Sequence, residues 1–140
     1  MGKSYWLIKT EPNDWSWEDQ INSKNQVAEW NGVRNYQARN NLKKMKINNL
    51  CFFYHTGDEK KIIGIVLVVK EFFNDKTDKS KKFVSVLIKA KKKLIYPVSL
   101  KSLKNDIFFK DLPLIKQSRL SVMNIKIKYW KKICKMGRIE

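Results

Sequence analysis

Cysteine, histidine and proline are scarce in this chain of 140 residues, and their scarcity limits the sites it can hold. The two cysteines, Cys51 and Cys134, lie far apart in apolar surroundings. This excludes a disulfide framework and predicts buried, reduced thiols and a cytoplasmic location. Because His55 is the single histidine, the ligand spacing of a zinc cluster is missing as well. No metal or other cofactor is therefore expected.

Long apolar runs and catalytic motifs are also missing. No run could span a membrane, and the apolar stretch near the N-terminus is cut by Lys9 and is too short for a secretory signal. Paired carboxylates, a glycine-rich phosphate loop and a nucleophile elbow are not found. Without repeats or a linker, residues 1–140 are predicted to form one domain. These absences favour a binding module over an enzyme or a membrane protein.

Positive charge is abundant and uneven. The net charge is +17, and residues 79–140 hold 18 Lys and Arg against 3 Asp and Glu. Such a basic half favours a polyanionic partner. A lysine-rich composition alone would also place lysines on solvated faces, so both interpretations stay open. Arginine is more informative, because only four of the 30 basic residues are Arg and three of these four lie in the motifs described below.

The pattern of apolar residues and turn signals predicts mixed secondary structure. Strands are expected at residues 4–9, 51–56, 61–73 and 83–95, with a last strand or extended segment at 117–123. Helices are expected from Asp14 or Ser16 to about residue 20, and at residues 33–45, 98–104 and 127–136. Residues 74–82 read as an exposed hairpin loop. Without βαβ alternation, this content predicts an α+β domain on a curved, largely antiparallel sheet.

Four segments are dense in aromatic, amide and single polar residues. They are YWLIKTEP from residue 5, WNGVRNYQARNNL from 30, FYHTG from 53 and PLIKQSRLSVM from 113. In this order they resemble the signature segments of the EVE domain family, over residues 4 to about 137. The family pattern more often has Ser where Thr10 and Thr56 stand, and Val-Arg where Ile115-Lys116 stands.

The resemblance implies a PUA-like fold, a curved mixed β-barrel flanked by short helices and related to the YTH and ASCH domains. It also implies recognition of modified cytosine in DNA. Extruding a base from a duplex costs a few kcal/mol, and stacking on aromatic rings returns ~1–3 kcal/mol per base. The candidate walls of a base pocket are Trp6, Trp15, Trp30 and Tyr54. The candidate polar groups are Thr10, Asn35, His55 and Ser118. The candidate phosphate ligands are Lys9, Arg34, Arg39, Lys116 and Arg119.

Several of these residues have an equally good structural interpretation. Trp6 and Trp30 fit a hydrophobic core, Asn35 fits a cap, and His55 fits a hydrogen-bonded structural residue. Arg39 could instead pair with an acid, either Asp14 or Glu29.

Three other functions stay open beside the leading hypothesis. A PUA-like fold also serves RNA, and the sequence does not separate RNA from DNA. An enzyme acting on a modified nucleobase would use Lys9, Thr10 and Glu11, although adjacent residues of a strand point to opposite faces. A protein-interaction module would not discriminate among bases. Oligomeric state is not predicted.

Overall fold

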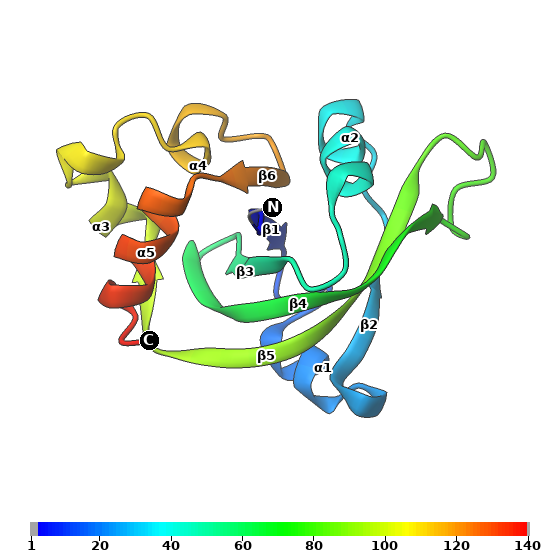
Figure 1. Ribbon diagram of the computed structural model, residues 1–140, viewed down its shortest axis with the longest axis horizontal. Helices are drawn as coiled ribbons and strands as arrows, with labels where there is room; N and C mark the ends of the chain where they lie inside the picture. The colour runs from blue at the N-terminus through cyan, green and yellow to red at the C-terminus, as the bar shows by residue number, and fades with distance from the viewer. Residues whose placement is uncertain (1–2, 140) are drawn as a thin grey trace.

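The computed structural model describes residues 3–139, in which helices flank one curved sheet (Figure 1). The strands are β1 (Tyr5–Thr10), β2 (Val27–Trp30), β3 (Leu50–His55), β4 (Lys61–Asn74), β5 (Val84–Ser99) and β6 (Val122–Ile125). The helices are α1 (Trp17–Asn22), α2 (Tyr36–Lys44), α3 (Leu100–Lys104), α4 (Pro113–Lys116) and α5 (Ile127–Met136), with 3₁₀ turns η1 (Lys24–Gln26) and η2 (Ile107–Phe109). The predicted α+β class is confirmed.

The strands form one mixed six-stranded sheet in the order β2-β5-β4-β3-β1-β6. β1 and β3 run parallel, whereas the other neighbouring strands pair antiparallel. Register shifts between β4 and β5 mark bulges, which bend strands, and Figure 1 shows both strands curving along the molecule. β2 and β6 are the two edges, so within residues 3–139 the sheet stays open and the implied barrel is not closed.

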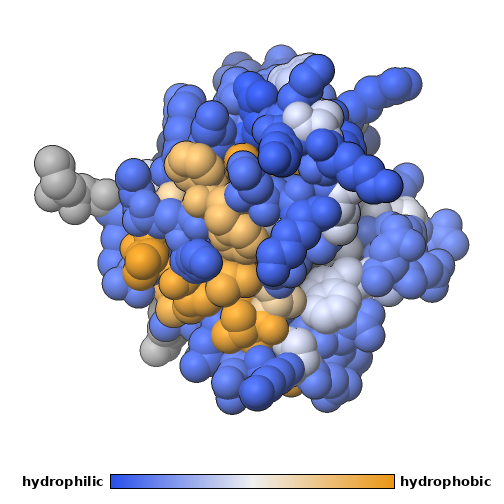
Figure 2. All heavy atoms as spheres, turned by 90° about the vertical axis from the view of Figure 1, so that its right-hand side faces the viewer, coloured by the Kyte–Doolittle hydropathy of each residue, from blue (hydrophilic) through white to orange (hydrophobic). Residues whose placement is uncertain are grey.

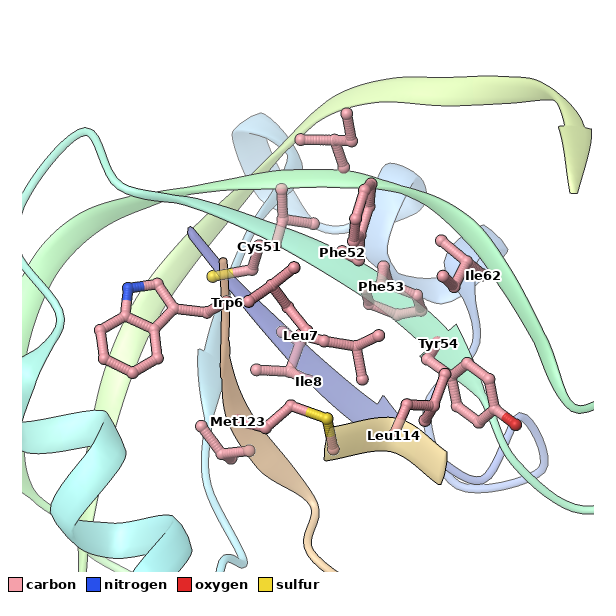
Figure 3. Close-up of a cluster of buried hydrophobic side chains, with 14 of the residues drawn as sticks. Trp6, Leu7, Ile8, Cys51, Phe52, Phe53, Tyr54, Ile62, Leu114 and Met123 are labelled. Atoms are coloured by element: carbon pink, nitrogen blue, oxygen red, sulfur yellow. The ribbon is translucent and has the colours of Figure 1, made fainter. Parts of the chain in front are cut away.

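The core is built on both faces of β3. Consecutive residues are buried along the middle of β1 and along β3, which requires cover on both faces of the sheet (Figure 3). Phe52 stacks on Trp130 of α5, with ring centroids 3.8 Å apart. Its neighbour Phe53 points the opposite way and meets the edge of Trp17 of α1 at 5.3 Å. β3 is therefore packed between α1 and α5.

The start of α2 differs from the prediction, and the reason is local. The helix expected at residues 33–45 begins at Tyr36, because the Asn35 Oδ1 accepts the Ala38 N–H at 2.9 Å and caps it. Tyr36, the first residue of α2, is 52% exposed and stacks on Phe83.

The C-terminal strands differ as well. The strand expected at residues 83–95 continues through Pro97 to Ser99, and Pro97 is tolerated because residues 94–97 have no partner on β4. The extended segment expected at 117–123 begins as a strand only at Val122. The helix expected at 98–104 begins at Leu100.

The two thiols are free, as predicted. Cys51 is buried and Cys134 is half-buried. Burial raises the pKa of Cys51 above its ordinary value and that of Cys134 to about 11, so both thiols stay protonated and poorly nucleophilic at neutral pH. Among the described residues, no helix is long and apolar enough to cross a membrane.

Candidate nucleic-acid interface

A cleft of about 900 Å³ opens where the end of β1, the turn before α1, β2 and the loop from β2 to α2 meet. Two of the four sequence motifs build most of its walls. Its lining residues are Lys9, Thr10, Glu11, Asp14, Trp15, Ala28, Glu29, Trp30, Asn31, Gly32, Val33, Arg34, Asn35 and Ser121. Figure 2 views the side of the molecule on which β2, α2 and the β4–β5 hairpin lie, and there hydrophilic side chains surround one apolar patch.

The loop from β2 to α2 is fixed at three points. Gly32 has a φ of +81°, a conformation that favours glycine, and its N–H donates to the Asp75 Oδ2 at 2.8 Å. Val33 is buried in the core, and Asn35 ends the loop by capping α2. The rim that this loop forms is therefore set before any ligand arrives.

Trp15 also lines the cleft and is held by a chain of hydrogen bonds. Its carbonyl accepts the Thr10 hydroxyl at 2.8 Å, and its indole N–H donates to the Gln20 Oε1 at 3.0 Å. Gln20 is fully buried and donates in turn to the Gln26 carbonyl at 2.8 Å. Trp15 itself is only half-buried, so its ring is oriented by these bonds while part of it stays open.

Trp30 is both a core residue and a part of the cleft wall, the two roles that the sequence left open. It is 7% exposed and meets Phe53 edge to face, with centroids 5.6 Å apart, so most of the ring belongs to the core. The remainder lines the cleft.

Lys9 and Arg34 line the cleft but already have partners. The Lys9 ammonium donates to the Ser118 carbonyl at 2.8 Å, and its burial lowers its pKa below the ordinary value. The Arg34 guanidinium pairs with Asp75 at 3.0 Å and donates to the Thr77 hydroxyl at 2.9 Å. Each therefore ties the cleft to a segment distant in sequence.

The predicted residues fall into three groups in space. Six line the cleft: Lys9, Thr10, Trp15, Trp30, Arg34 and Asn35. Ser118 and Arg119 line an adjoining hollow of about 320 Å³ that shares Asn35 with the cleft. The other five, Trp6, Arg39, Tyr54, His55 and Lys116, lie outside both.

Arg39 and Lys116 sit on the surface beyond the cleft. Arg39 pairs with neither of the acids considered for it: its guanidinium lies 4.8 Å from the Tyr36 ring centroid and donates to the Lys82 carbonyl. Lys116 lies 3.8 Å from an Asp111 carboxylate oxygen.

Trp6 and Tyr54 are core residues in this structure (Figure 3). Trp6 is 3% exposed and its indole N–H donates to the buried Asn49 Oδ1 at 3.0 Å. Tyr54 is also 3% exposed, and burial raises its pKa to about 12. Neither ring can stack on a base without the core opening, so both are corrected from pocket walls to core.

His55 is likewise a structural residue. Its Nε2 accepts the backbone N–H of Trp17 at 3.0 Å, so the proton of the neutral ring sits on Nδ1, which donates to the Glu59 Oε1 at 3.1 Å. The ring is 6% exposed and fastens the start of α1 to the end of β3.

The His55→Ala substitution is expected to lower the free energy of unfolding by ~1–3 kcal/mol, because the buried Trp17 N–H loses its acceptor. Urea unfolding would measure this. The matched control is Glu59→Ala, which removes the exposed partner of the same ring and should change stability by only ~0–1 kcal/mol. Equal small effects of the two substitutions would contradict the structural role of His55.

Lys9, Thr10 and Glu11 do not form a hydroxyl-activating set. The Lys9 ammonium and the Thr10 hydroxyl are bonded to the carbonyls named above, and the Glu11 Oε1 accepts the Asn13 N–H at 2.8 Å. Within residues 3–139, no group of three or more His, Cys, Asp or Glu could hold a metal ion.

Sequence reasoning missed the acidic lining of the cleft. Glu11, Asp14 and Glu29 face it together with Ser121. From the sequence, Asp14 is a candidate helix start and a candidate ion-pair partner, whereas Glu29 is a candidate ion-pair partner only and lies on β2, a strand too short to be predicted. A cleft with acceptors on its wall can bind a ligand that carries amino donors.

The chain is similar to known proteins in sequence and in fold. A model of the EVE domain matches residues 4–136. The chain is 45% identical to chicken (Gallus gallus) thymocyte nuclear protein 1 over 83 residues, which are 52% of this chain and 34% of that protein. The chain thus spans about a third of the length of this curated relative.

Two solved structures are similar over nearly the whole chain. One is the NMR structure of a protein from Rhodopseudomonas palustris, which is 41% identical with a TM-score of 0.90, over 96% of this chain and 93% of that one. The other is human THYN1 in complex with DNA containing 5-methylcytosine, which is 27% identical with a TM-score of 0.92, over 99% of both chains.

Proposed function

Since the chain belongs to the EVE domain family, we propose that it binds nucleic acid and holds one extruded base in the cleft, with a modified cytosine in DNA as the favoured ligand. The observation that carries the proposal is the convergence of two distant motif segments on this one cleft. The similar human THYN1 structure, which is a complex with DNA containing 5-methylcytosine, supports the choice of base.

The dimensions and walls of the cleft suit a planar heterocycle. Its volume of about 900 Å³ lies within the range of ~300–1,000 Å³ that small-molecule sites occupy. Trp15, which is half-buried, and the small exposed part of Trp30 both bring aromatic surface to the cleft lining. Stacking returns ~1–3 kcal/mol per base, which offsets the few kcal/mol that extrusion costs.

The acidic lining favours cytosine over thymine. Cytosine presents an exocyclic amino donor, which Glu or Asp accepts, whereas thymine presents a carbonyl oxygen there. Asp14 and Glu29 are exposed members of the cleft wall and are the acceptors that we assign to this amino group.

The double substitution Asp14→Asn and Glu29→Gln is expected to reduce the preference for cytosine-type over thymine-type bases. Each good base contact is worth ~1–3 kcal/mol of discrimination, which is about 5- to 140-fold. The ratio of dissociation constants for oligonucleotides that differ at one base would measure it. Glu18→Gln with Asp58→Asn removes the same charge from exposed positions outside the cleft and is the control. An unchanged ratio in the cleft variant would contradict the assignment.

Phosphates flanking the base need cations at the rim. Arg119 is exposed and lines the adjoining hollow beside Asn35, which places it next to the cleft entrance. Lys116 is exposed at the end of α4 and directly precedes Gln117, which lines that hollow. Both stay proposed phosphate ligands, because a phosphate displaces a weak surface ion pair at little cost.

A binding screen of short DNA and RNA oligomers tests the function directly. The oligomers carry unmodified, 5-methylated or otherwise modified cytosine at one position, and mass analysis follows long incubation. Tighter binding of modified DNA is the expected result. Equal binding of all bases would overturn the proposal in favour of a protein-interaction module. Preference for RNA through its 2′-OH, or conversion of the base to a product, would replace it with the corresponding alternative.

A further inference from the structure

The turn that joins β4 to β5 is fastened to the rim of the cleft. Asp75, at the start of this turn, is buried and accepts four hydrogen bonds. Two come from the rim, from the Gly32 N–H at 2.8 Å and Arg34 at 3.0 Å, and two come from the Thr77 N–H and hydroxyl at 2.8 and 2.6 Å. Burial opposes its ionisation, but these bonds outweigh that effect and hold the pKa of Asp75 below its ordinary value.

The turn is also rigid in itself. The Asp78 carboxylate accepts the Ser80 hydroxyl and N–H and the N–H groups of Lys82 and Phe83. Its hydrogen bond from the Ser80 side chain is the main reason that the pKa of Asp78 falls to about 2. The Asp75 N–H donates to the Phe83 carbonyl at 3.1 Å and closes the turn. Residues 74–82, a stretch of low sequence complexity, therefore form an ordered turn.

Four exposed lysines project from this ordered turn. They are Lys76, Lys79, Lys81 and Lys82. Within residues 3–139, none of them forms an ion pair within 4.0 Å. Figure 1 shows the β4–β5 hairpin extending beyond the body of the molecule, on the same side as β2 and α2. These lysines are called the hairpin lysines below.

The cleft itself does not supply the charge that a phosphodiester needs. Three carboxylates line it, Arg34 is neutralised by Asp75, and the Lys9 ammonium is occupied by a carbonyl. A strand that delivers a base to this cleft must therefore find cations outside its walls. The hairpin lysines are fixed to the cleft rim, because Lys76 follows Asp75 directly and Asp75 binds the rim residues Gly32 and Arg34.

We propose that the hairpin lysines form a second contact site, which binds the phosphodiester backbone beside the base held in the cleft. This inference rests on the proposed function. Backbone contacts carry no direct sequence information, so this site raises the affinity for modified and unmodified DNA alike. The tether to the rim sets where the backbone runs relative to the base.

The salt dependence of duplex binding tests the site. The variant Lys76→Gln, Lys79→Gln, Lys81→Gln, Lys82→Gln is compared with Lys101→Gln, Lys104→Gln, Lys131→Gln, Lys135→Gln, which removes four exposed charges from α3 and α5. Each lost phosphate contact lowers the slope of log affinity against log salt by about 0.9. The slope of the hairpin variant should fall by the amount that corresponds to at least two lost phosphate contacts, on modified and unmodified duplexes alike. The control variant should keep the slope of the unsubstituted protein.

Equal slopes for the two variants would overturn the inference while leaving base recognition intact. A protein that binds both duplexes equally would instead refute the proposed function, and the slopes would still report on the hairpin. A protein that binds no duplex at low salt would refute both. Thermal melting checks that each variant is folded. The double substitution Lys79→Gln with Lys81→Gln is a milder second variant, whose slope should fall by the amount of about one phosphate contact or more.

Discussion

Alanine in place of Trp15 is expected to weaken binding of a modified-cytosine duplex by about 5- to 140-fold, which corresponds to the ~1–3 kcal/mol that stacking on one base supplies. Trp15 is the cleft aromatic with the larger open surface, and its orientation is fixed by its indole bond to Gln20. Fluorescence anisotropy with a labelled duplex would measure the change. The matched control is Tyr96→Ala, because Tyr96 is 57% exposed at the far end of β5 and should not affect binding.

The Trp15→Phe variant separates stacking from folding. It keeps a ring against the base but removes the N–H that donates to Gln20, so it should recover much of the affinity that alanine loses. If the alanine variant folds and still binds the modified duplex as tightly as the unsubstituted protein, then Trp15 is not a wall of the base site.

Alanine in place of Trp30 should have a different outcome, a loss of ~3–5 kcal/mol in the free energy of unfolding. The ring is almost entirely buried and meets Phe53 of β3, so its removal leaves a cavity beside the Phe53 ring. A domain of this size has ~5–15 kcal/mol of stability in total, so the variant should unfold at much lower urea concentration. Chemical denaturation followed by circular dichroism provides the measurement.

The Trp30→Phe variant serves as the comparison, since it retains most of the buried ring and should lose less stability than the alanine variant. A Trp30→Ala protein that keeps its full stability and loses only DNA affinity would show that the ring serves the ligand alone. Because Trp30 also borders the cleft, binding assays of either variant need conditions in which folding is complete.

Much of the fold could be predicted from the sequence because its signals are local. The strand in β3 and the helix α5 follow from their apolar patterns, and the turn at Asn31-Gly32 follows from a residue that tolerates positive φ. β2 could not be predicted, because its four residues show too little periodicity and its place is set by pairing with β5.

The candidate site was predictable at the level of segments and less so at the level of single residues. Trp6 and Trp15 look alike in the sequence, yet the former lies on β1, which has a paired strand on each side, and the latter lies in a turn. Burial depends on what packs against a residue from elsewhere in the chain, and no local pattern reports that. The role of the β4–β5 turn could not be predicted for the same reason. In the sequence Asp75 is one of several acidic loop residues, and only the structure shows that it accepts a hydrogen bond from Gly32, 43 residues away.

The pairing of β1 with β6 bears on how the protein is made. Tyr5 lies opposite Ile125, so the outer neighbour of β1 is synthesised after the five other strands of the sheet. Until β6 has been made, the outer side of β1, away from β3, is therefore an unpaired edge, and such edges are prone to misassociation. The β1–β6 pairing is accordingly the last strand pairing of this sheet to become possible during synthesis, and slower translation of the segment before β6 would prolong the exposure of the outer edge of β1 to chaperones.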